Sequence, residues 1–386
     1  MENSSKGIFS PLLLKLFISI SAIVFCTTTF ADDGTGSSTI LILDGAHIIG
    51  QGQATITIRD GRIESIGKNL SSAKTNEVNL QGKFIVPGFI DSHVHLAIGY
   101  KPEQLTQGGI VAAVDLAAPL HHLSSDYDNL QLLLSGPMVT ARRGYPTMSW
   151  GADGYGLETS GVDSVRKAVD FLVASGAKVI KIPVGDTTGK GAIPGMDENK
   201  SVLNDKELKA IVEQAHSHGL RVVAHAITDD AAMRAAKAGA DVLSHTPTVV
   251  LSDKTVEAWS ERALMSSLAV FKKTPAAVNN LRRLREAGTT ILYGTDLGYS
   301  EIPGVNVEEL KQLQEAGLDG DAILRSVTET PAKYWGFEGL GIIKVGARAT
   351  LLVLDADPRE DLSTLARPHA VYIDGIKLNS AASSQK

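Results

Sequence analysis

The stretch Gly219-Leu-Arg-Val-Val-Ala-His225 contains a glycine that ends one element and an apolar run that forms the next. Apolar side chains recur at helical spacing in the segment before it: Leu208, Ile211, Val212 and Ala215. Asn204 can begin this helix, because Glu207 three residues later completes a capping box. Glycine directly after a helix favours the left-handed conformation that ends it. The stretch therefore predicts a helix, a tight loop and a buried strand in succession.

The same unit occurs three more times along the chain. A glycine stands before an apolar run each time: Gly176 before 178–181, Gly239 before 241–245 and Gly288 before 290–296. Four further apolar runs raise the predicted number of strands to eight: 89–95, 110–116, 138–141 and Ser267–Phe271. Repeated helix, loop and buried strand indicate parallel βα units. We therefore expect an α/β fold with a (β/α)₈ TIM-type barrel over residues 87–336. An open doubly wound sheet is the alternative, but no glycine-rich dinucleotide fingerprint follows the first strand.

Short β-branched runs dominate both ends of the chain outside the barrel. They occupy residues 38–86 and 341–380, and Asp60-Gly61 and Asp374-Gly375 are hairpin turn signals within them. Two strand-rich segments at opposite termini predict one small β-sandwich domain that the chain leaves and re-enters.

The first 31 residues have the composition of a secretory signal peptide. Lys6 and Lys15 precede the apolar run Leu16–Cys26, and small residues lead to a cleavage site after Ala31. The run is shorter than the roughly 20 apolar residues that span a bilayer. We expect cleavage, no stable membrane insertion afterwards, and a secreted or periplasmic protein; an uncleaved anchor is the alternative.

Net charge and cysteine content limit the binding partners and the metal ligands that are expected. The net charge of −6 argues against nucleic acid as the main partner, because binding it needs a basic face. The only cysteine, Cys26, is lost with the signal peptide, so any metal must be held by nitrogen and oxygen donors. The expected partner is a small-molecule substrate, and the sequence leaves a homo-oligomer open.

Polar side chains end the apolar runs of the repeated units. These final residues are Lys181, His225, His245 and Asp296. In a parallel barrel such strand ends converge on the face that carries catalysis. His93 and His95 end the first strand, and side chains two apart on a strand point to the same side. Four histidines, a carboxylate and a lysine at one end of a barrel are typical of a Zn²⁺-type site. The remaining histidines are predicted to be structural or at the surface: His47, His121, His122, His216, His218 and His369.

The segment Val86-Pro-Gly-Phe-Ile-Asp-Ser-His-Val-His-Leu96 resembles the signature opening of the amidohydrolase superfamily. Residues 341–346 and 351–358 resemble the return of that family to its β-domain, so the resemblance covers nearly the whole mature chain. Its nearest branches are imidazolonepropionase-like and Xaa-Pro or Xaa-Arg dipeptidase-like. The resemblance implies that the metal ligands are His93, His95, His225, His245 and Asp296.

The resemblance also assigns a role to Lys181. Binuclear members of the family carboxylate this lysine, which then bridges two metal ions. The chain is therefore expected to hold one or two divalent ions, Zn²⁺ foremost, with Lys181 N6-carboxylated. An unmodified Lys181 beside a single ion is the alternative.

The expected reaction is hydrolysis of a C–N bond in an amide, cyclic amide or dipeptide-like substrate. Metal-activated water would attack the carbonyl, and Asp296 would take its proton and pass it to the leaving amine. One alternative is lactone, ester or phosphotriester hydrolysis by the same centre. Another is a non-catalytic periplasmic metal- or ligand-binding protein. Adenosine-type deamination is disfavoured, because the residues after His225 lack the glutamate that such deaminases use as an acid.

The glycine- and aromatic-rich segment 141–156 follows the third strand and is predicted to cover the substrate. Arg142 and Arg143 are candidates for holding a substrate carboxylate. Tyr145 and Trp150 complete the set of predicted substrate-binding residues. Asp91, two residues before the first ligand, is predicted to support the site from behind.

Overall fold

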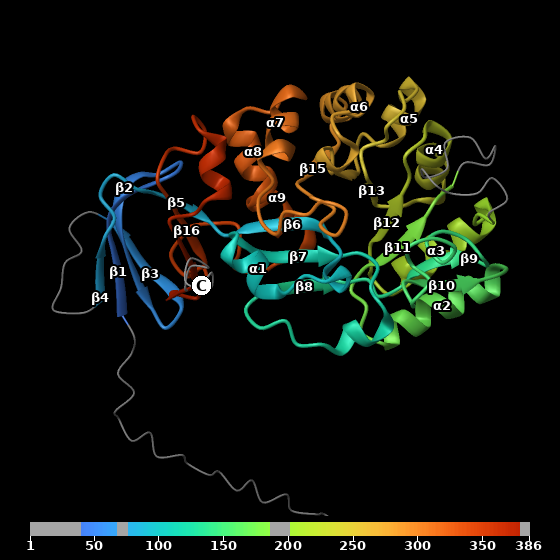
Figure 1. The fold of residues 1–386 in the computed structure, drawn as a ribbon, viewed down its shortest axis with the longest axis horizontal. Helices are drawn as coiled ribbons and strands as arrows, with labels where there is room; N and C mark the ends of the chain where they lie inside the picture. The colour runs from blue at the N-terminus through green and yellow to red at the C-terminus, as the bar shows by residue number, and fades with distance from the viewer. Residues whose placement is uncertain (1–39, 68–75, 186–200, 379–386) are drawn as a thin grey trace, which may run out of the picture. The chain divides into compact units, whose positions relative to one another are not determined.

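The protein was analysed as a computed structural model that describes residues 40–67, 76–185 and 201–378 (Figure 1). The predicted signal peptide, residues 1–31, lies outside these ranges. None of the helices in the described ranges is long and apolar enough to cross a membrane.

Short parallel strands form the centre of the molecule. Five pair in one sheet: β11 (Ile180–Pro183), β12 (Val222–His225), β13 (Val242–Ser244), β14 (Ala263–Met265) and β15 (Thr290–Leu292). Three pair in a second sheet: β6 (Phe89–Val94), β7 (Ile110–Asp115) and β8 (Gln131–Leu134). A further parallel pair consists of β9 (Met138–Ala141) and β10 (Gly156–Thr159).

Backbone hydrogen bonds connect the two larger sheets. Ser92 N donates to Tyr293 O at 2.8 Å, and Asp296 N donates to His93 O at 2.9 Å, so the segment after β15 lies along β6. Lys178 N, just before β11, donates to Leu134 O at the end of β8 at 2.8 Å. These three bonds bring together segments that are distant in sequence, which is the arrangement that a barrel requires.

Helices cover the outside of these strands, and each one from α2 to α9 packs beside the next in the chain (Figure 1). The helices are α1 (Pro102–Gln107), α2 (Val162–Ala174), α3 (Asp205–Ser217), α4 (Asp229–Ala238), α5 (Asp253–Ala258), α6 (Pro275–Glu286), α7 (Val307–Glu315), α8 (Gly320–Val327) and α9 (Glu329–Trp335). Short 3₁₀ helices lie at Leu96–Ile98, Leu120–Ser124, Ala269–Phe271 and Leu362–Ala366.

Helix α3 has the local features that its sequence predicts. The Asn204 side chain accepts hydrogen bonds from the backbone N–H groups of Lys206 and Glu207, and the Glu207 carboxylate accepts from the Asn204 backbone N–H. The predicted glycines that end the helices all have positive φ: Gly176, Gly219, Gly239 and Gly288. Helix starts and stops in this region therefore follow from local chemistry.

The predicted strand at Ser267–Phe271 is wrong. The strand lies four residues earlier, at β14, where Ala263 is in register with Val242 on one side and Thr290 on the other. Ser267 has φ +39°, which turns the chain out of the sheet, and Ala269–Phe271 forms a 3₁₀ helix. Lys181 is also displaced from its predicted place, because it is the second residue of β11 and not the last residue of the strand.

Strands from both ends of the chain form one mixed sheet of eight strands. Its members are β1 (Ile40–Ile48), β2 (Gly52–Arg59), β3 (Arg62–Gly67), β4 (Asn76–Asn79), β5 (Phe84–Pro87), β16 (Leu351–Leu354), β17 (Ala370–Ile373) and β18 (Ile376–Lys377). β5 pairs antiparallel with β16, which joins the two ends of the chain. The sheet has its own core, which includes Ile56, Ile85 and Leu351. Division of this sheet into a sandwich stays a prediction.

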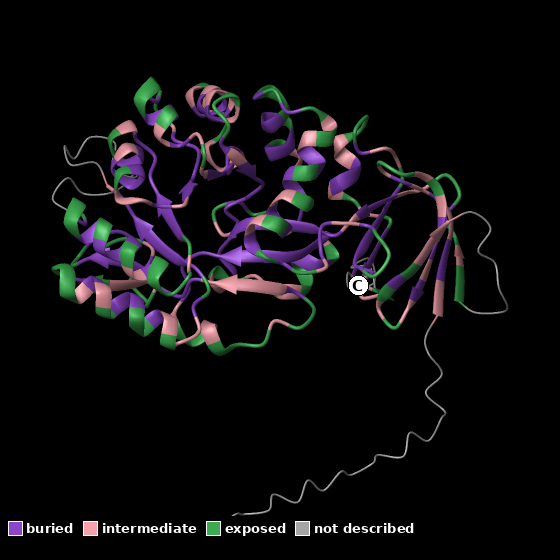
Figure 2. Ribbon diagram, turned by 180° about the vertical axis from the view of Figure 1, so that it is seen from behind, coloured by how far each residue is buried: buried purple, intermediate pink, exposed green. Residues whose placement is uncertain are grey.

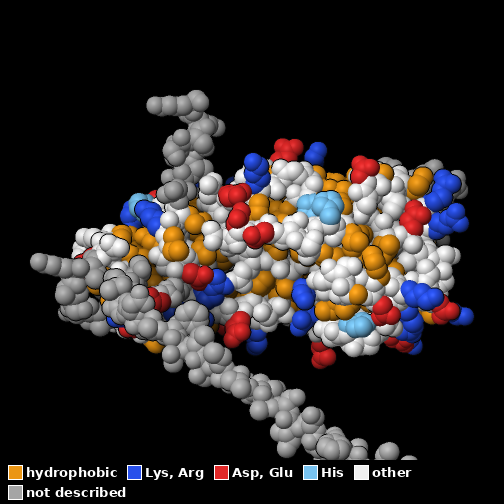
Figure 3. All heavy atoms as spheres, turned by 90° about the horizontal axis from the view of Figure 1, so that it is seen from below, with side chains coloured by type: hydrophobic (Ala, Val, Ile, Leu, Met, Phe, Trp, Pro, Cys, Tyr) orange, Lys and Arg blue, Asp and Glu red, His pale blue; other side chains and the backbone are white. Residues whose placement is uncertain are grey.

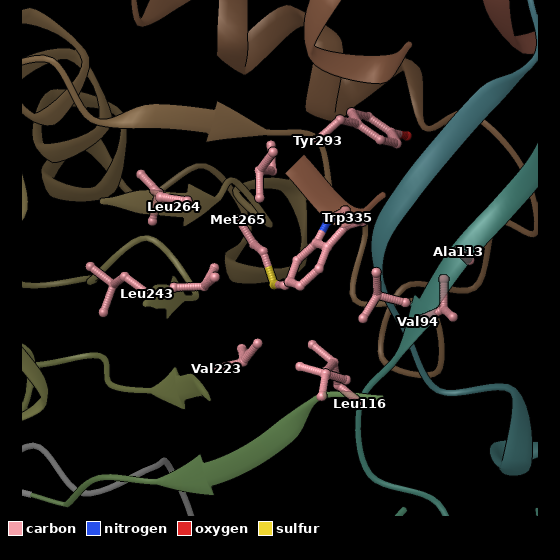
Figure 4. Close-up of a cluster of buried hydrophobic side chains, with 14 of the residues drawn as sticks. Val94, Ala113, Leu116, Val223, Leu243, Leu264, Met265, Tyr293 and Trp335 are labelled. Carbon is pink, nitrogen blue, oxygen red and sulfur yellow. The ribbon is translucent and has the colours of Figure 1, made fainter. Parts of the chain in front are cut away.

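The main core lies among the parallel strands, where burial is continuous (Figure 2). Val223 of β12 and Met265 of β14 lie on one face of the sheet, whereas Leu243 of β13 lies on the other (Figure 4). Trp335 of α9 lies beside Met265 there, and its Nε1 donates to Ser92 Oγ at 3.1 Å. This packing fixes the strands whose ends carry the polar residues.

Candidate metal centre

Six polar residues predicted for the site line one cavity of about 230 Å³. They are His93, His95, Lys181, His225, His245 and Asp296, and none of them is more than 6% exposed. Five segments supply them: β6 and the residue after it, β11, β12, and the segments that follow β13 and β15. Parallel strands bring residues together at their carboxyl ends although up to 203 positions separate them in sequence.

The carboxylate of Asp296 is the centre of this group. Its Oδ1 lies 2.9 Å from His95 Nε2 and 3.3 Å from His93 Nε2, and its Oδ2 lies 3.7 Å from His245 Nδ1. His93, His245 and Asp296 each offer one ligand atom, and these three atoms lie within 4.8 Å of one another. Asp296 has φ +56°, a left-handed conformation that aspartate tolerates better than most residues.

Several donor atoms of this group are buried without a hydrogen bond. They include His93 Nε2, His225 Nε2 and His245 Nδ1. An unpaired buried polar atom is costly, and native proteins rarely tolerate several side by side. Nitrogen and carboxylate oxygen donors that converge in this way match the ligand set of Zn²⁺ and similar divalent ions. The residues present therefore fit a metal ion.

Burial also sets the protonation of the histidines. It lowers the pKa values of His93 and His225 well below the usual value, and it lowers the pKa of His245 to about 4. These imidazoles are therefore neutral at pH 7, the form that binds a metal. Burial opposes ionisation of Asp296, but the surrounding histidines outweigh it and hold its pKa well below the usual range.

Lys181 has a neutral partner. Its Nζ donates to Ser244 Oγ at 2.7 Å, and Ser244 Oγ lies 3.2 Å from His93 Nδ1. Burial lowers the pKa of Lys181 to about 7, although Asp296 acts in the opposite direction. Sequence reasoning missed Ser244, because strand alternation assigns neighbours of a site residue to the opposite face.

Aromatic side chains form one wall of the cavity. Tyr145 stacks on His225 with ring centroids 5.2 Å apart. Trp150 donates from Nε1 to the Tyr145 hydroxyl at 2.8 Å, and its ring lies 5.7 Å from that of His95. Tyr145 lines the cavity, whereas Trp150 packs behind it. The other two predicted substrate-binding residues, Arg142 and Arg143, are exposed and lie outside the lining.

The other apolar lining residues were missed by sequence reasoning: Met138, Val270, Phe271 and Tyr299. The Phe271 ring lies 5.3 Å from His245, and the Tyr299 ring lies 6.1 Å from His95. Because Phe271 was predicted to lie in a strand, its position in the loop that lines the cavity was not predicted. Tyr299 could have been predicted from the sequence, because it follows Asp296 by three residues in the loop after the last strand, and such loops line the catalytic face of a barrel.

Asp91 supports the site from behind. Its Oδ1 accepts from the backbone N–H groups of His93 at 2.9 Å and Thr295 at 3.1 Å, and its Oδ2 accepts from Thr295 Oγ1 at 2.6 Å. Asp91 thus ties the first ligand strand to the segment that carries Asp296.

The histidines predicted to lie outside the site do so. His216 pairs with Asp241 at 2.9 Å and His218 pairs with Asp170 at 2.7 Å on the outer surface. His47, His121, His122 and His369 likewise lie outside the lining of the cavity.

Known proteins resemble this chain over most of its length. It is 27% identical to an imidazolonepropionase of Streptomyces avermitilis, over 87% of each chain. It is also 27% identical to an adenine deaminase of Deinococcus deserti, over 78% of this chain but only 53% of the relative, so it spans about half of that protein. The crystal structure of a Xaa-Pro dipeptidase with bound methionine matches 88% of this chain and all of that chain, with a TM-score of 0.75 at 21% identity.

These similarities confirm the expected resemblance to imidazolonepropionase-like and dipeptidase-like proteins. The model of the amidohydrolase family matches residues 84–377, which include the complete polar group around the cavity. The chain is an enzyme and belongs to the amidohydrolase family.

Proposed function

We propose that this protein is a metal-dependent hydrolase that cleaves a C–N bond in a small molecule, with its site on a closed (β/α)₈ barrel. The observation that carries the proposal is the convergence of three buried histidine nitrogens without hydrogen-bond partners, from His93, His225 and His245, in the cavity that the Asp296 carboxylate also lines. Relatives named imidazolonepropionase and Xaa-Pro dipeptidase support the choice of a C–N bond.

The proposed ligands are His93, His95, His225, His245 and Asp296. One or two divalent ions, Zn²⁺ foremost, would act as Lewis acids toward a carbonyl oxygen and lower the pKa of a water molecule. Asp296 is ionised and lies 2.9 Å from His95, which holds its carboxylate in place. Asp296 accepts the proton of the attacking water and then donates it to the leaving amine. The buried wall around these groups limits access of bulk water.

We also propose that Lys181 is N6-carboxylated when two ions are bound. Its amine is buried and has a lowered pKa, so a neutral form is available to add to CO₂ and lose one proton. The product is a carbamate, an oxygen ligand in place of an amine. A ¹³C NMR spectrum of the metal-loaded protein in ¹³C-bicarbonate should contain a carbamate signal that Lys181→Gln removes. A spectrum without that signal would leave the single-ion alternative with an unmodified lysine.

Metal analysis of the purified protein tests whether these residues bind a metal ion. We expect one or two divalent ions per chain, with loss of metal in His93→Ala and His245→Ala. The matched control is His218→Ala, which removes a histidine that pairs with Asp170 on the outer surface. Less than one ion per chain in the purified wild type would exclude the proposed function.

A substrate screen tests the reaction itself. The metal-loaded protein should hydrolyse at least one class among dipeptides, N-acyl amino acids and hydantoins. Turnover of lactones or phosphotriesters with none of these amides would favour the alternative ester-type activity of the same centre.

We further propose that the mature protein is exported after cleavage behind Ala31. The support is the basic and apolar pattern of residues 1–31. N-terminal sequencing of the protein from the periplasm or the medium should begin at Asp32. An intact N-terminus in a membrane fraction would contradict the proposal.

A further inference from the structure

We propose that the cavity selects substrates with an uncharged aromatic or bulky aliphatic group next to the scissile bond, and that Phe271 and Tyr299 contact this group. The inference rests on the proposed hydrolase function and specifies the substrate class of that site. No carboxylate on the substrate is needed for binding.

Among the described residues, the lining outside the metal ligands and Lys181 is apolar or aromatic. It consists of Met138, Tyr145, Val270, Phe271 and Tyr299. A cavity of about 150 Å³ can hold benzene. The cavity here, at about 230 Å³, therefore has room for a ring together with the short scissile group.

Phe271 and Tyr299 flank the metal ligands from two sides. Phe271 contacts His245 edge-on, with ring centroids 5.3 Å apart and an interplanar angle of 80°. Tyr299 approaches His95 edge-on at 6.1 Å and 84°. Since His95 and His245 both lie against the Asp296 carboxylate, a group attached to a carbonyl bound there lies between these two rings.

Both rings are held in place before a substrate arrives. The 3₁₀ helix Ala269–Phe271 is anchored by Glu309, whose Oε2 accepts from Ala269 N at 2.7 Å. Tyr299 packs against Trp150 at 5.6 Å, and Trp150 is hydrogen-bonded to Tyr145. Tyr299 is 45% exposed, so the group can extend past it toward solvent.

A charged group finds a poor environment in this lining. Lys181 is the one lysine or arginine among the described lining residues, and its Nζ donates to Ser244 Oγ. The predicted carboxylate clamps, Arg142 and Arg143, are exposed and outside the lining. A substrate carboxylate against Phe271 and Tyr299 would be desolvated without a matched cation, which is unfavourable.

Binding of hydroxamic acids to the metal-loaded protein tests the inference without turnover. By isothermal titration, phenylacetohydroxamic acid should bind at least about tenfold more tightly than acetohydroxamic acid, because it buries a ring. A 4-carboxyl group on that ring should remove most of this gain in affinity.

Phe271→Ala and Tyr299→Ala should each reduce the preference for phenylacetohydroxamic acid about fivefold or more, with unchanged metal content. Phe171→Ala, which truncates an exposed phenyl group on α2, is the matched control and should leave the preference intact.

The outcomes separate the two proposals. A protein that holds metal but binds both hydroxamates equally, or prefers the carboxylated one, overturns the inference and leaves the hydrolase function standing. A protein that holds no metal overturns the proposed function and this inference with it.

Discussion

At the residue scale, Asp296 has two proposed roles. It is a metal ligand that lies against three histidines, and it is the base that accepts the proton of the attacking water. Asp296→Asn keeps the shape of the side chain but removes its negative charge and its basicity. The variant should retain most of its metal through the four histidines, while kcat falls by about 10²- to 10⁴-fold. Metal analysis beside steady-state kinetics checks this, with Asp170→Asn on the exposed face of α2 as control. A fully active Asp296→Asn would exclude the proposed role.

Ser244 joins a predicted ligand to the lysine, although sequence alone gave no sign of it. Ser244→Ala removes the acceptor of the Lys181 bond and the partner of His93 Nδ1. Loss of a buried hydrogen-bond partner should lower the free energy of unfolding by about 1–3 kcal/mol. Metal affinity should fall about 10- to 100-fold, as for other groups that orient metal ligands.

Chemical denaturation and metal competition measure these two effects of Ser244→Ala. Ser217→Ala, which removes an exposed hydroxyl at the end of α3, serves as the control. Unchanged metal affinity in Ser244→Ala would show that Ser244 does not orient His93.

At the scale of elements, α7 supports the loop that carries Phe271 through one buried carboxylate. Glu309 is fully buried, and burial raises its pKa to about 7. Ser266 and the backbone N–H groups of Ala269 and Leu268 act in the opposite direction, while the negative charge of Glu308 adds to the rise. Asp91 is the other buried acid that interacts with it.

Because the pKa of Glu309 is raised in the folded state, the free energy of unfolding should fall as the pH rises. The folded protein binds this proton more tightly than the unfolded chain, so the stabilisation is complete below about pH 4.5 and is lost as the pH rises through about 7. Glu309→Gln should therefore flatten the decline of unfolding free energy between pH 5 and 8, by up to roughly 3 kcal/mol. Urea denaturation at several pH values measures the slope, with Glu315→Gln at the exposed end of α7 as control. Equal slopes in wild type and Glu309→Gln would contradict the assignment.

At the scale of the whole molecule, the metal centre joins strands from across the fold. Metal binding should stabilise the protein by about 4 kcal/mol when the free ion exceeds its Kd a thousandfold. A chelator should therefore lower Tm, and added Zn²⁺ should restore it. His245→Ala should show a smaller shift than wild type, while His218→Ala should match wild type. If the Tm does not change when chelator is added, a bound metal ion does not stabilise the folded protein.

The charge distribution on the face drawn in Figure 3 agrees with a small-molecule enzyme. On the face in Figure 3, acidic and basic side chains are scattered among apolar ones and form no continuous field of one sign. This distribution suits the net charge of −6 and the expectation of a small-molecule substrate.

Local sequence alone determined the capped helix ends and most of the polar group. The Asn204–Glu207 capping box and the helix-ending glycines act within a few residues, so their geometry can be read directly from the chain. His225 at the end of β12 and Asp296 in the segment after β15 followed from the same periodicity, because parallel strands present their carboxyl ends on one face.

Only the tertiary structure decided what surrounds that polar group. The strand expected at Ser267–Phe271 lies at Ala263–Met265, because sheet register depends on pairing with β13 and β15 and not on apolar content alone. Ser244, Phe271 and Tyr299 reach the site through contacts with residues up to 204 positions away. Such contacts depend on how loops from separate strands pack over one face, and no local pattern encodes that packing.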